Sequence, residues 1–268
     1  MKQTAILVDG GFFIRRIDHF QRKYFQGLNL TAEHLTQILN RIATQHVQNL
    51  SSPKNTQPHT LYRIYFYDCP PLTDQIRYPI PDKGCKTAGT WNTKKHPPYQ
   101  LRSELHDRLR RNRKTALRLG SLSKQGEWQL NSPVLKELIS GVKVWADLTK
   151  DDFHYEIAQK MVDTKLGVDI TSLAMERLVD AIVLVAGDSD FVPAAKLARK
   201  KGIDFLLDPM WGTTTHGLTE HVDGVRSWDL VSLIKAVSGV DPTLRPSWWK
   251  AEAEESANDP AIQPANMV

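Results

Sequence analysis

The chain has 268 residues, 41% of them hydrophobic, which is enough for a large α/β domain or for a domain with a sizeable insertion. Its formal net charge of +5 is compatible with a polyanionic partner. The two cysteines, Cys69 and Cys85, form no CxxC pair, which excludes a disulfide framework and a zinc finger. Without a signal-peptide pattern or an apolar run of about 20 residues, we expect a cytoplasmic protein that has no membrane anchor.

The first half of the chain contains two runs typical of buried strands, each followed by an aspartate. Residues 5–8 precede Asp9, and the aromatic and β-branched residues 61–67 precede Asp68. The apolar spacing between these runs predicts two helices, over residues 12–17 and 31–47. Strands that are apolar at nearly every position are buried on both faces, so we predict a parallel sheet covered by helices.

The middle of the chain concentrates positive charge. Residues 72–98 are rich in Pro, Lys and Gly with weak periodicity, which predicts an irregular insertion. Residues 101–119 have the apolar spacing of a helix and carry seven basic residues against two acidic ones, a surplus equal to the net charge of the whole chain. Such a run is either a solvated helix face or a patch that contacts phosphates.

Residues 150–178 predict a long helical stretch that carries Asp163 and Asp169. Six positions separate the two carboxylates, which places them about 120° apart around the axis, so an unbroken helix cannot direct both to one point. Asp163 shares a face with Leu166 and Ile170, and we expect it to face inward, where an unpaired carboxylate needs a cation or strong donors. Asp169 is expected to be a solvated or capping residue.

Residues 180–207 predict a strand, an acidic turn, a helix and a second strand, in that order. Gly187 allows a sharp bend after the first strand, and Asp188 and Asp190 follow it, with Asp190 at or near the N-cap of the helix. Taken alone, both aspartates are ordinary turn and cap residues. In a parallel sheet, however, ligands bind beyond the carboxyl ends of the strands, where the other strand-end aspartates are also expected.

Several carboxylates that meet at one edge would repel one another and raise their pKa values, unless a cation lies between them. Oxygen ligands without His or Cys favour Mg²⁺ or Mn²⁺ over zinc. Such sites typically act on phosphates by activating water and stabilising the leaving oxygen. No GxxxxGK[ST] sequence is present, so a Walker-type nucleotide site is excluded. The aspartates therefore predict a metal site that acts on phosphates.

Four motifs, in the order of a known family, carry a more specific resemblance. They are VDGGFF at residues 8–13, YFYD at 65–68, QKMVDTKLGVDI at 159–170 and VAGDSDFVPAAKLARKKG at 185–202. With these motifs the chain resembles the NYN domain family, including its bacterial LabA-like group, in the PIN-like nuclease superfamily. The resemblance implies a PIN-like three-layer α/β sandwich, with a mainly parallel central sheet flanked by helices, and a site that binds Mg²⁺ or Mn²⁺ and hydrolyses RNA.

The resemblance also assigns roles to individual residues. Four aspartates match the family's catalytic metal-site positions: Asp9, Asp163, Asp188 and Asp190. Asp68 and Asp169 match further acidic positions of the metal site, and Ser189 is expected to contact a phosphate or a metal-bound water. The other candidates for substrate binding are basic: Lys160, Arg15, Arg108, Arg110, Arg111, Arg113 and Lys114.

The chain departs from the family pattern at two places. Many NYN domains have Asn a few residues after the first Asp, where this chain has Gly, Phe and Phe at residues 11–13. The helix motif usually reads QKGVD, and Met161 replaces its Gly, which bears on how closely the backbone approaches a substrate. Neither change removes a candidate metal ligand.

The leading hypothesis is a metal-dependent endoribonuclease that hydrolyses single-stranded or structured RNA. The alternatives are a non-catalytic RNA-binding or regulatory adaptor that keeps the fold, and a DNA-directed nuclease, because no residue identifies a reader of the 2′-hydroxyl. We expect one NYN domain over residues 1–239, with a basic insertion around 72–132, and a disordered tail over 240–268. A homo-oligomer is also compatible with the sequence.

Overall fold

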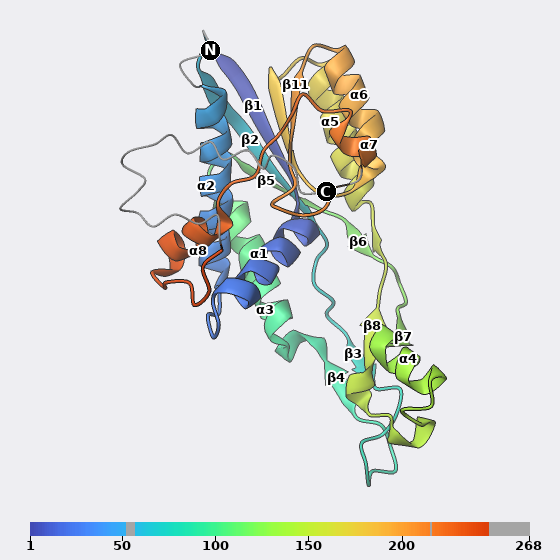
Figure 1. The fold of residues 1–268 in the computed structure, drawn as a ribbon. Helices are drawn as coiled ribbons and strands as arrows, with labels where there is room; N and C mark the ends of the chain where they lie inside the picture. Colours follow the sequence, from blue (N-terminus) through green and yellow to red (C-terminus); the bar gives the residue numbers. More distant parts are fainter. Residues whose placement is uncertain (52–56, 215, 247–268) are drawn as a thin grey trace. The chain divides into compact units, whose positions relative to one another are not determined.

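The computed structural model describes residues 1–51, 57–214 and 216–246, which form two compact units (Figure 1). Unit 1 consists of Met1–Asp68, Leu105–Arg118 and the described residues from Asp163 onward, and unit 2 of Cys69–Glu104 and Leu119–Val162. The predicted tail, residues 240–268, falls mostly outside the described residues. The single domain over residues 1–239 with a basic insertion stays a prediction.

Unit 1 is built on a six-stranded sheet in the order β12-β11-β10-β1-β2-β5. The strands are β1 (Lys2–Asp9), β2 (His59–Asp68), β5 (Thr115–Leu119), β10 (Ala181–Val185), β11 (Asp204–Asp208) and β12 (Gly224–Val225). From β12 to β2, every neighbouring pair is parallel. The inner residues of β1 and all of β10 are buried, which confirms that their apolar runs are covered on both faces.

Helices cover both faces of this sheet. They are α1 (Gly10–Tyr24), α2 (Ala32–Leu50), α3 (Pro97–Arg111), α5 (Val162–Met175), α6 (Val192–Lys200), α7 (His216–Thr219) and α8 (Leu230–Ser238). Figure 1 shows α1, α2 and α8 on one face and α5 and α6 on the other, so the expected α/β sandwich of PIN-like type is confirmed. No helix in the described ranges is long and apolar enough to cross a membrane.

Unit 2 contains three short antiparallel strand pairs, the helix α4 (Ser132–Ile139) and the first part of α3, up to Glu104. The pairs are β3 (Gln75–Arg77) with β4 (Thr90–Asn92), β6 (Ser121–Leu122) with β9 (Gln159–Lys160), and β7 (Glu127–Leu130) with β8 (Phe153–Glu156). The connections contain three short 3₁₀ helices: η1 (Thr93–Lys95), η2 (Trp145–Asp147) and η3 (Lys150–Asp152). The Trp128 ring packs against those of Tyr78, Trp91 and Tyr155, with centroids 5.3 to 5.9 Å away, so aromatic contacts hold this unit together.

The basic helix is shorter than the sequence predicted. It ends at Arg111, and residues 115–119 form the edge strand β5 instead of a further helical turn. The chain leaves the helix at Lys114, whose φ of 57° lies in the left-handed region. The Asn112 side chain holds this turn by donating to Oγ1 of Thr115 over 2.8 Å. Periodicity alone did not reveal the turn, because its two sides continue the same apolar spacing.

The helix predicted over residues 150–178 is also wrong in extent. Its first part forms β8 and β9, and only Val162–Met175 is helical as α5. The change occurs at Met161, where φ is 70°. A left-handed residue cannot continue a right-handed helix, so α5 begins just after it. This is the position at which the related motif has Gly, and glycine adopts that conformation without steric strain.

We predict that Gly10→Ala strongly destabilises unit 1. A Cβ on Gly10 would lie 2.4 Å from the Phe66 ring and 2.7 Å from the Tyr67 carbonyl oxygen, and the backbone atom cannot move away easily. Overpacking of this kind costs about 1–3 kcal/mol or more. Thermal unfolding should show a lower melting temperature. Gly11→Ala is the matched control, because its Cβ would meet nothing closer than 3.4 Å. Equal effects of both changes would contradict this packing.

We predict that Met161→Gly stabilises the protein relative to Met161→Ala. Both changes remove a side chain that is 56% exposed, but only glycine relieves the left-handed backbone. The left-handed conformation destabilises a folded protein by about 1–2 kcal/mol when the residue is not glycine. Glycine avoids this cost but makes the unfolded chain more flexible, which offsets about 0.5–1 kcal/mol of the gain. Urea unfolding measures the difference. A midpoint for Ala at or above that for Gly would show that Met161 is not strained.

Candidate functional site

The parallel register brings several aspartates to the carboxyl edge of the central sheet. Asp9 ends β1 and pairs with Tyr67, so Asp68 lies one residue beyond it at the end of β2. On the other side, β10 pairs with β1 up to Val8 and Val185, and Asp188 follows three residues later. Strands that run in the same direction necessarily end at the same edge, which is why residues far apart in sequence meet here.

Asp9 connects the sheet to α1. It is the N-cap of α1, and its Oδ1 accepts a hydrogen bond from the Phe12 backbone N–H over 3.0 Å. Burial raises the pKa of this carboxyl, the Phe12 bond and nearby Arg15 lower it, and the charges of Asp163 and Asp68 raise it further. The net pKa of Asp9 is higher than usual, because its environment disfavours the charged form of the carboxyl.

Asp163 lies in the first turn of α5 and is exposed. The expectation that it faces inward is therefore wrong, although Leu166 and Ile170 of the same stripe are buried. The stripe reaches the core only after the first turn of the helix. Partial burial, followed by the charges of Asp188 and Asp190, raises the pKa of Asp163. The α5 aspartate thus shares its electrostatic environment with the acidic turn that follows β10.

The acidic turn after β10 presents Asp188 and Asp190 to solvent. Asp188 Oδ1 accepts a hydrogen bond from the Asp190 N–H over 3.2 Å. Asp190 lies in the 3₁₀ helix η4 (Ser189–Phe191), and the N-cap of α6 is Phe191 and not Asp190. The side chain of Ser189 lies outside the described part of the chain, so its predicted role stays a prediction.

Close packing fixes this turn against α1. A Cβ on Gly187 would lie 2.7 Å from Cε2 of Phe12, so only a glycine fits between the ring and the chain leading to Asp188. The Phe12 backbone also donates to Asp9. One residue of α1 therefore positions both the β1 carboxylate and the approach to the β10 carboxylates. The sequence motifs contain these residues but do not reveal their contact.

Asp68 has a different environment from the other strand-end carboxylates. It is buried, and its Oδ2 lies 2.8 Å from Nε2 of the buried His106 on α3. This contact joins α3 to the end of β2 and engages one oxygen of Asp68, whose charge still acts on Asp9. Sequence analysis missed His106. Its only signal was a histidine between Leu105 and Leu109 on an apolar helix stripe.

Asp169 is held by side chains instead of being solvated or capping. Its Oδ2 accepts from the Tyr67 hydroxyl over 2.8 Å and from Arg118 Nε over 3.0 Å, and Arg118 also donates to Oδ1 over 3.3 Å. Burial raises the pKa of Tyr67 strongly, and Asp169 adds to the effect. These contacts link β2, β5 and α5. They fix the orientation of Asp169, and both of its carboxylate oxygens accept hydrogen bonds from these side chains.

The four remaining carboxylates have the oxygen donors that a hard divalent cation prefers, but they are not arranged around a common point as ligands. They are Asp9, Asp163, Asp188 and Asp190. Within the described ranges, no three His, Cys, Asp or Glu side chains form a group that could hold a metal ion. The donors are all carboxylate oxygens; burial raises the pKa values of Asp9 and Asp163 most, and the charges of neighbouring aspartates raise them further. A divalent cation would remove that repulsion. Binding would therefore require the exposed side chains of the set to move inward.

Three of the seven predicted basic candidates have intramolecular partners in the structure. Arg108 lies 3.3 Å from Glu33, Arg110 pairs with Asp107, and the Lys114 ammonium donates to the Leu61 carbonyl. Three further candidates are exposed: Arg15, Arg111 and Arg113. Lys160 is exposed on β9 of unit 2. Surface pairs of this kind are weak and exchange readily, so they do not prevent phosphate contacts.

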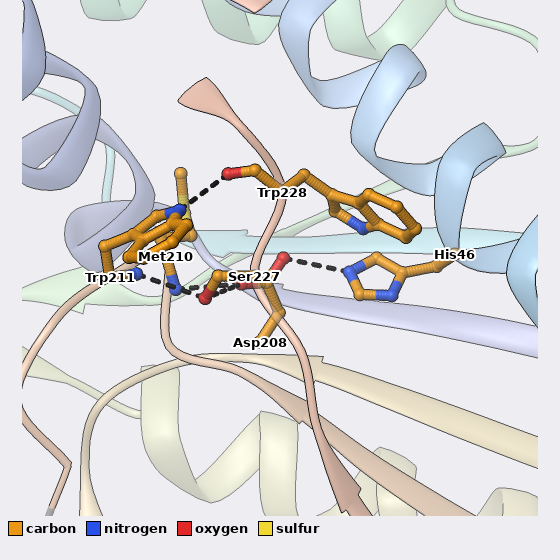
Figure 2. Close-up of polar contacts among 6 residues, drawn as sticks. All are labelled: His46, Asp208, Met210, Trp211, Ser227 and Trp228. Atoms are coloured by element: carbon orange, nitrogen blue, oxygen red, sulfur yellow. Dashed lines mark hydrogen bonds and ion pairs between the residues drawn. The ribbon is translucent and has the colours of Figure 1, made fainter. Parts of the chain in front are cut away.

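The end of β11 contains a second buried group that sequence analysis did not single out (Figure 2). Asp208 Oδ2 lies 2.9 Å from Nε2 of His46 on α2, and both side chains are buried. Asp208 Oδ1 accepts from the Met210 N–H over 2.8 Å and from Ser227 Oγ over 2.9 Å. Asp208 therefore anchors the loop after β11. It differs in this from the exposed aspartates after β10.

Comparison with known proteins finds a match to a domain family and to a curated relative. The NYN domain model matches residues 120–225, which include the motifs at 159–170 and 185–202. Uncharacterized protein MJ0482 of Methanocaldococcus jannaschii is 27% identical over 128 residues, 47% of this chain. The chain spans about half the length of that curated relative (50%).

A solved structure of a protein of unknown function, VPA0982 from Vibrio parahaemolyticus RIMD 2210633, aligns with 85% of this chain and 93% of its own. Its TM-score is 0.39 at 14% identity, too low to inform function. The family match is the informative finding. It shows a match to the NYN domain over residues 120–225, and NYN domains belong to the PIN-like nuclease superfamily.

Proposed function

We propose that this protein is a metal-dependent ribonuclease that hydrolyses phosphodiester bonds of single-stranded or structured RNA. The observation that carries the proposal is the shared electrostatic environment of four carboxylates from three distant segments: Asp9, Asp163, Asp188 and Asp190. Folds do not usually retain mutual repulsion without a compensating use. The NYN match supports a nuclease, and the all-carboxylate donor set supports Mg²⁺ or Mn²⁺.

In the proposed mechanism, each residue has a task that follows from its position. Asp9, fixed by its cap bond, provides a rigid oxygen at the end of β1, while Asp188 and Asp190 are exposed and can approach a ligand. Bound Mg²⁺ or Mn²⁺ would supply charge neutralisation at the scissile phosphate and activation of water. Arg15, close enough to lower the pKa of Asp9, is placed to contact a phosphate oxygen.

The end of α3 is proposed to contact the nucleic-acid backbone. Arg111 and Arg113 are exposed near the end of this helix, and Arg108 and Arg110 can exchange their surface partners for phosphates. Contacts of this kind are independent of sequence and weaken as salt increases. They therefore support affinity for RNA or DNA alike, and the choice between the two sugars rests on the family alone.

We predict that wild type cleaves labelled single-stranded RNA with Mn²⁺ or Mg²⁺ and not with EDTA, and that Asp188→Asn loses at least about 100-fold in rate while remaining folded. Asp147→Asn, an exposed carboxylate on η2 of unit 2, is the matched control and should cleave normally. Matched DNA tests the sugar preference, and gel assays with circular dichroism give both readouts. Tight, salt-sensitive binding by wild type without any cleavage would instead favour the adaptor.

We predict that the acidic site destabilises the metal-free protein as the pH rises. The folded-state pKa values of Asp9 and Asp163 are raised, so their contribution to stability is complete below the unfolded carboxyl pKa, about 4, and is lost as the pH rises through the raised values. In EDTA, the melting temperature of Asp9→Asn should fall less than that of wild type as the pH rises from about 4 through the raised pKa values. Asn caps a helix as well as Asp does but carries no charge.

The same melts with Mn²⁺ at neutral pH complete this test. The ion should raise the melting temperature of wild type and have a smaller effect on Asp9→Asn, whereas Asp147→Asn should behave as wild type does. Equal Mn²⁺ stabilisation of wild type and Asp9→Asn would remove Asp9 from the proposed metal site. This readout is independent of cleavage.

A further inference from the structure

The loop that follows β11 has an unusual backbone. Met210 and Trp211 are consecutive and both left-handed, with φ of 47° and 60°. Non-glycine residues are strained in this conformation, and such strain persists only where surrounding contacts hold it. Glycine would relieve the strain at either position, yet the chain has two large side chains.

Four polar contacts hold this strained loop, and Figure 2 shows the three that do not involve α1. Oδ1 of Asp208 accepts from the Met210 N–H, and Ser227 Oγ accepts from the Trp211 N–H over 3.1 Å. The Trp211 indole Nε1 donates to the Trp228 carbonyl over 2.7 Å. Arg16 of α1 donates to the Met210 carbonyl over 2.9 Å. The loop is therefore fixed from α1, from its own strand and from the segment after β12, and the Trp211 ring has one defined orientation.

The loop lies at the same edge of the sheet as the acidic residues. Asp208 pairs with Val185, so β10 and β11 end side by side. The Phe12 ring lies between the two loops that follow: a Cβ on Gly187 would be 2.7 Å from it and one on Gly212 would be 3.5 Å from it. The residue before Asp188 and the residue after Trp211 thus contact the same ring. One side chain separates Trp211's loop from the carboxylates.

We propose that Trp211 is a stacking platform for an unpaired base of a single-stranded nucleic acid beside the scissile phosphate. The proposal rests on the proposed nuclease function and adds the strand state of its substrate. Trp211 is half-buried, and its Nε1 edge is anchored to the Trp228 carbonyl. Aromatic platforms next to basic grooves bind single strands because every base has a π-face, whereas paired bases are already stacked.

The test compares binding by variants in the Asp188→Asn background, in EDTA and at fixed salt, so that no RNA is cut. The probe is a fluorescein-labelled single-stranded RNA, and a second probe has abasic nucleotides at its central positions. Trp211→Ala should weaken binding of the first probe about 5- to 100-fold and of the abasic probe hardly at all, whereas Trp211→Phe should stay within about threefold of the parent. Trp145→Ala, which removes a 71% exposed tryptophan from unit 2, is the control and should bind both probes normally.

A purely structural role for Trp211 gives a different pattern. Loss of the Trp228 contact would lower the melting temperature of Trp211→Phe and Trp211→Ala alike and weaken both probes equally, which would overturn the proposal. Crosslinking of 4-thiouridine RNA to the parent protein, mapped by mass spectrometry, tests the contact without any change at Trp211. Failure to label peptides containing Trp211 would also overturn it.

The outcomes for stacking and for catalysis separate cleanly. Cleavage that depends on Asp188, together with unchanged binding by Trp211→Ala, would retain the nuclease and reject the platform. Base-dependent loss of binding in Trp211→Ala, without cleavage by the parent wild type, would retain the platform and reject the nuclease. Equal loss for single-stranded and duplex RNA would reject the preference for unpaired bases.

Discussion

Parallel pairing of β1 with β2 on one side and β10 on the other is the constraint on which the site depends. Because the register aligns Asp9 with Tyr67 and Val8 with Val185, backbone pairing brings the carboxyl ends of three strands to one edge. Burial of these strands on both faces makes a change of register costly. The positions of the carboxylates are thus a consequence of core packing.

Aspartates at this edge fall into two classes, separated by their partners. Asp68 and Asp208 are buried, and each has a buried histidine from a helix, His106 or His46, within hydrogen-bonding distance. These pairs fasten α3 and α2 to the sheet, and leaving such a buried polar group without its partner typically costs about 1–3 kcal/mol. The other class remains exposed or half-buried and keeps oxygens available. Stability and chemistry therefore use the same residue type at the same edge with different surroundings.

Electrostatic repulsion in the second class links structure to function. Burial of Asp9 and the nearby carboxylates raise the pKa of Asp9, and Asp188 and Asp190 do the same for Asp163. Carboxylates brought together in this way lower the stability of a protein and attract cations. Phe12 of α1 holds Asp9 and the chain leading to Asp188 near each other. Its backbone N–H donates to Asp9, and its ring packs against Gly187.

Local patterns of apolar residues, glycine and carboxylates were enough to predict the parallel α/β core, the strands that end in aspartates and the acidic turn at Asp188. Tertiary structure decided which aspartates remain available. The His106 to Asp68 contact joins residues 38 positions apart, and the His46 to Asp208 contact joins residues 162 apart. The tertiary structure also makes residues 115–119 the strand β5, where a helix was expected. It leaves Asp163 exposed and places Trp211 in a loop with left-handed backbone. Periodicity reports which face of an element is apolar, whereas partners from distant segments determine how each polar side chain is satisfied, so no local pattern contains that information.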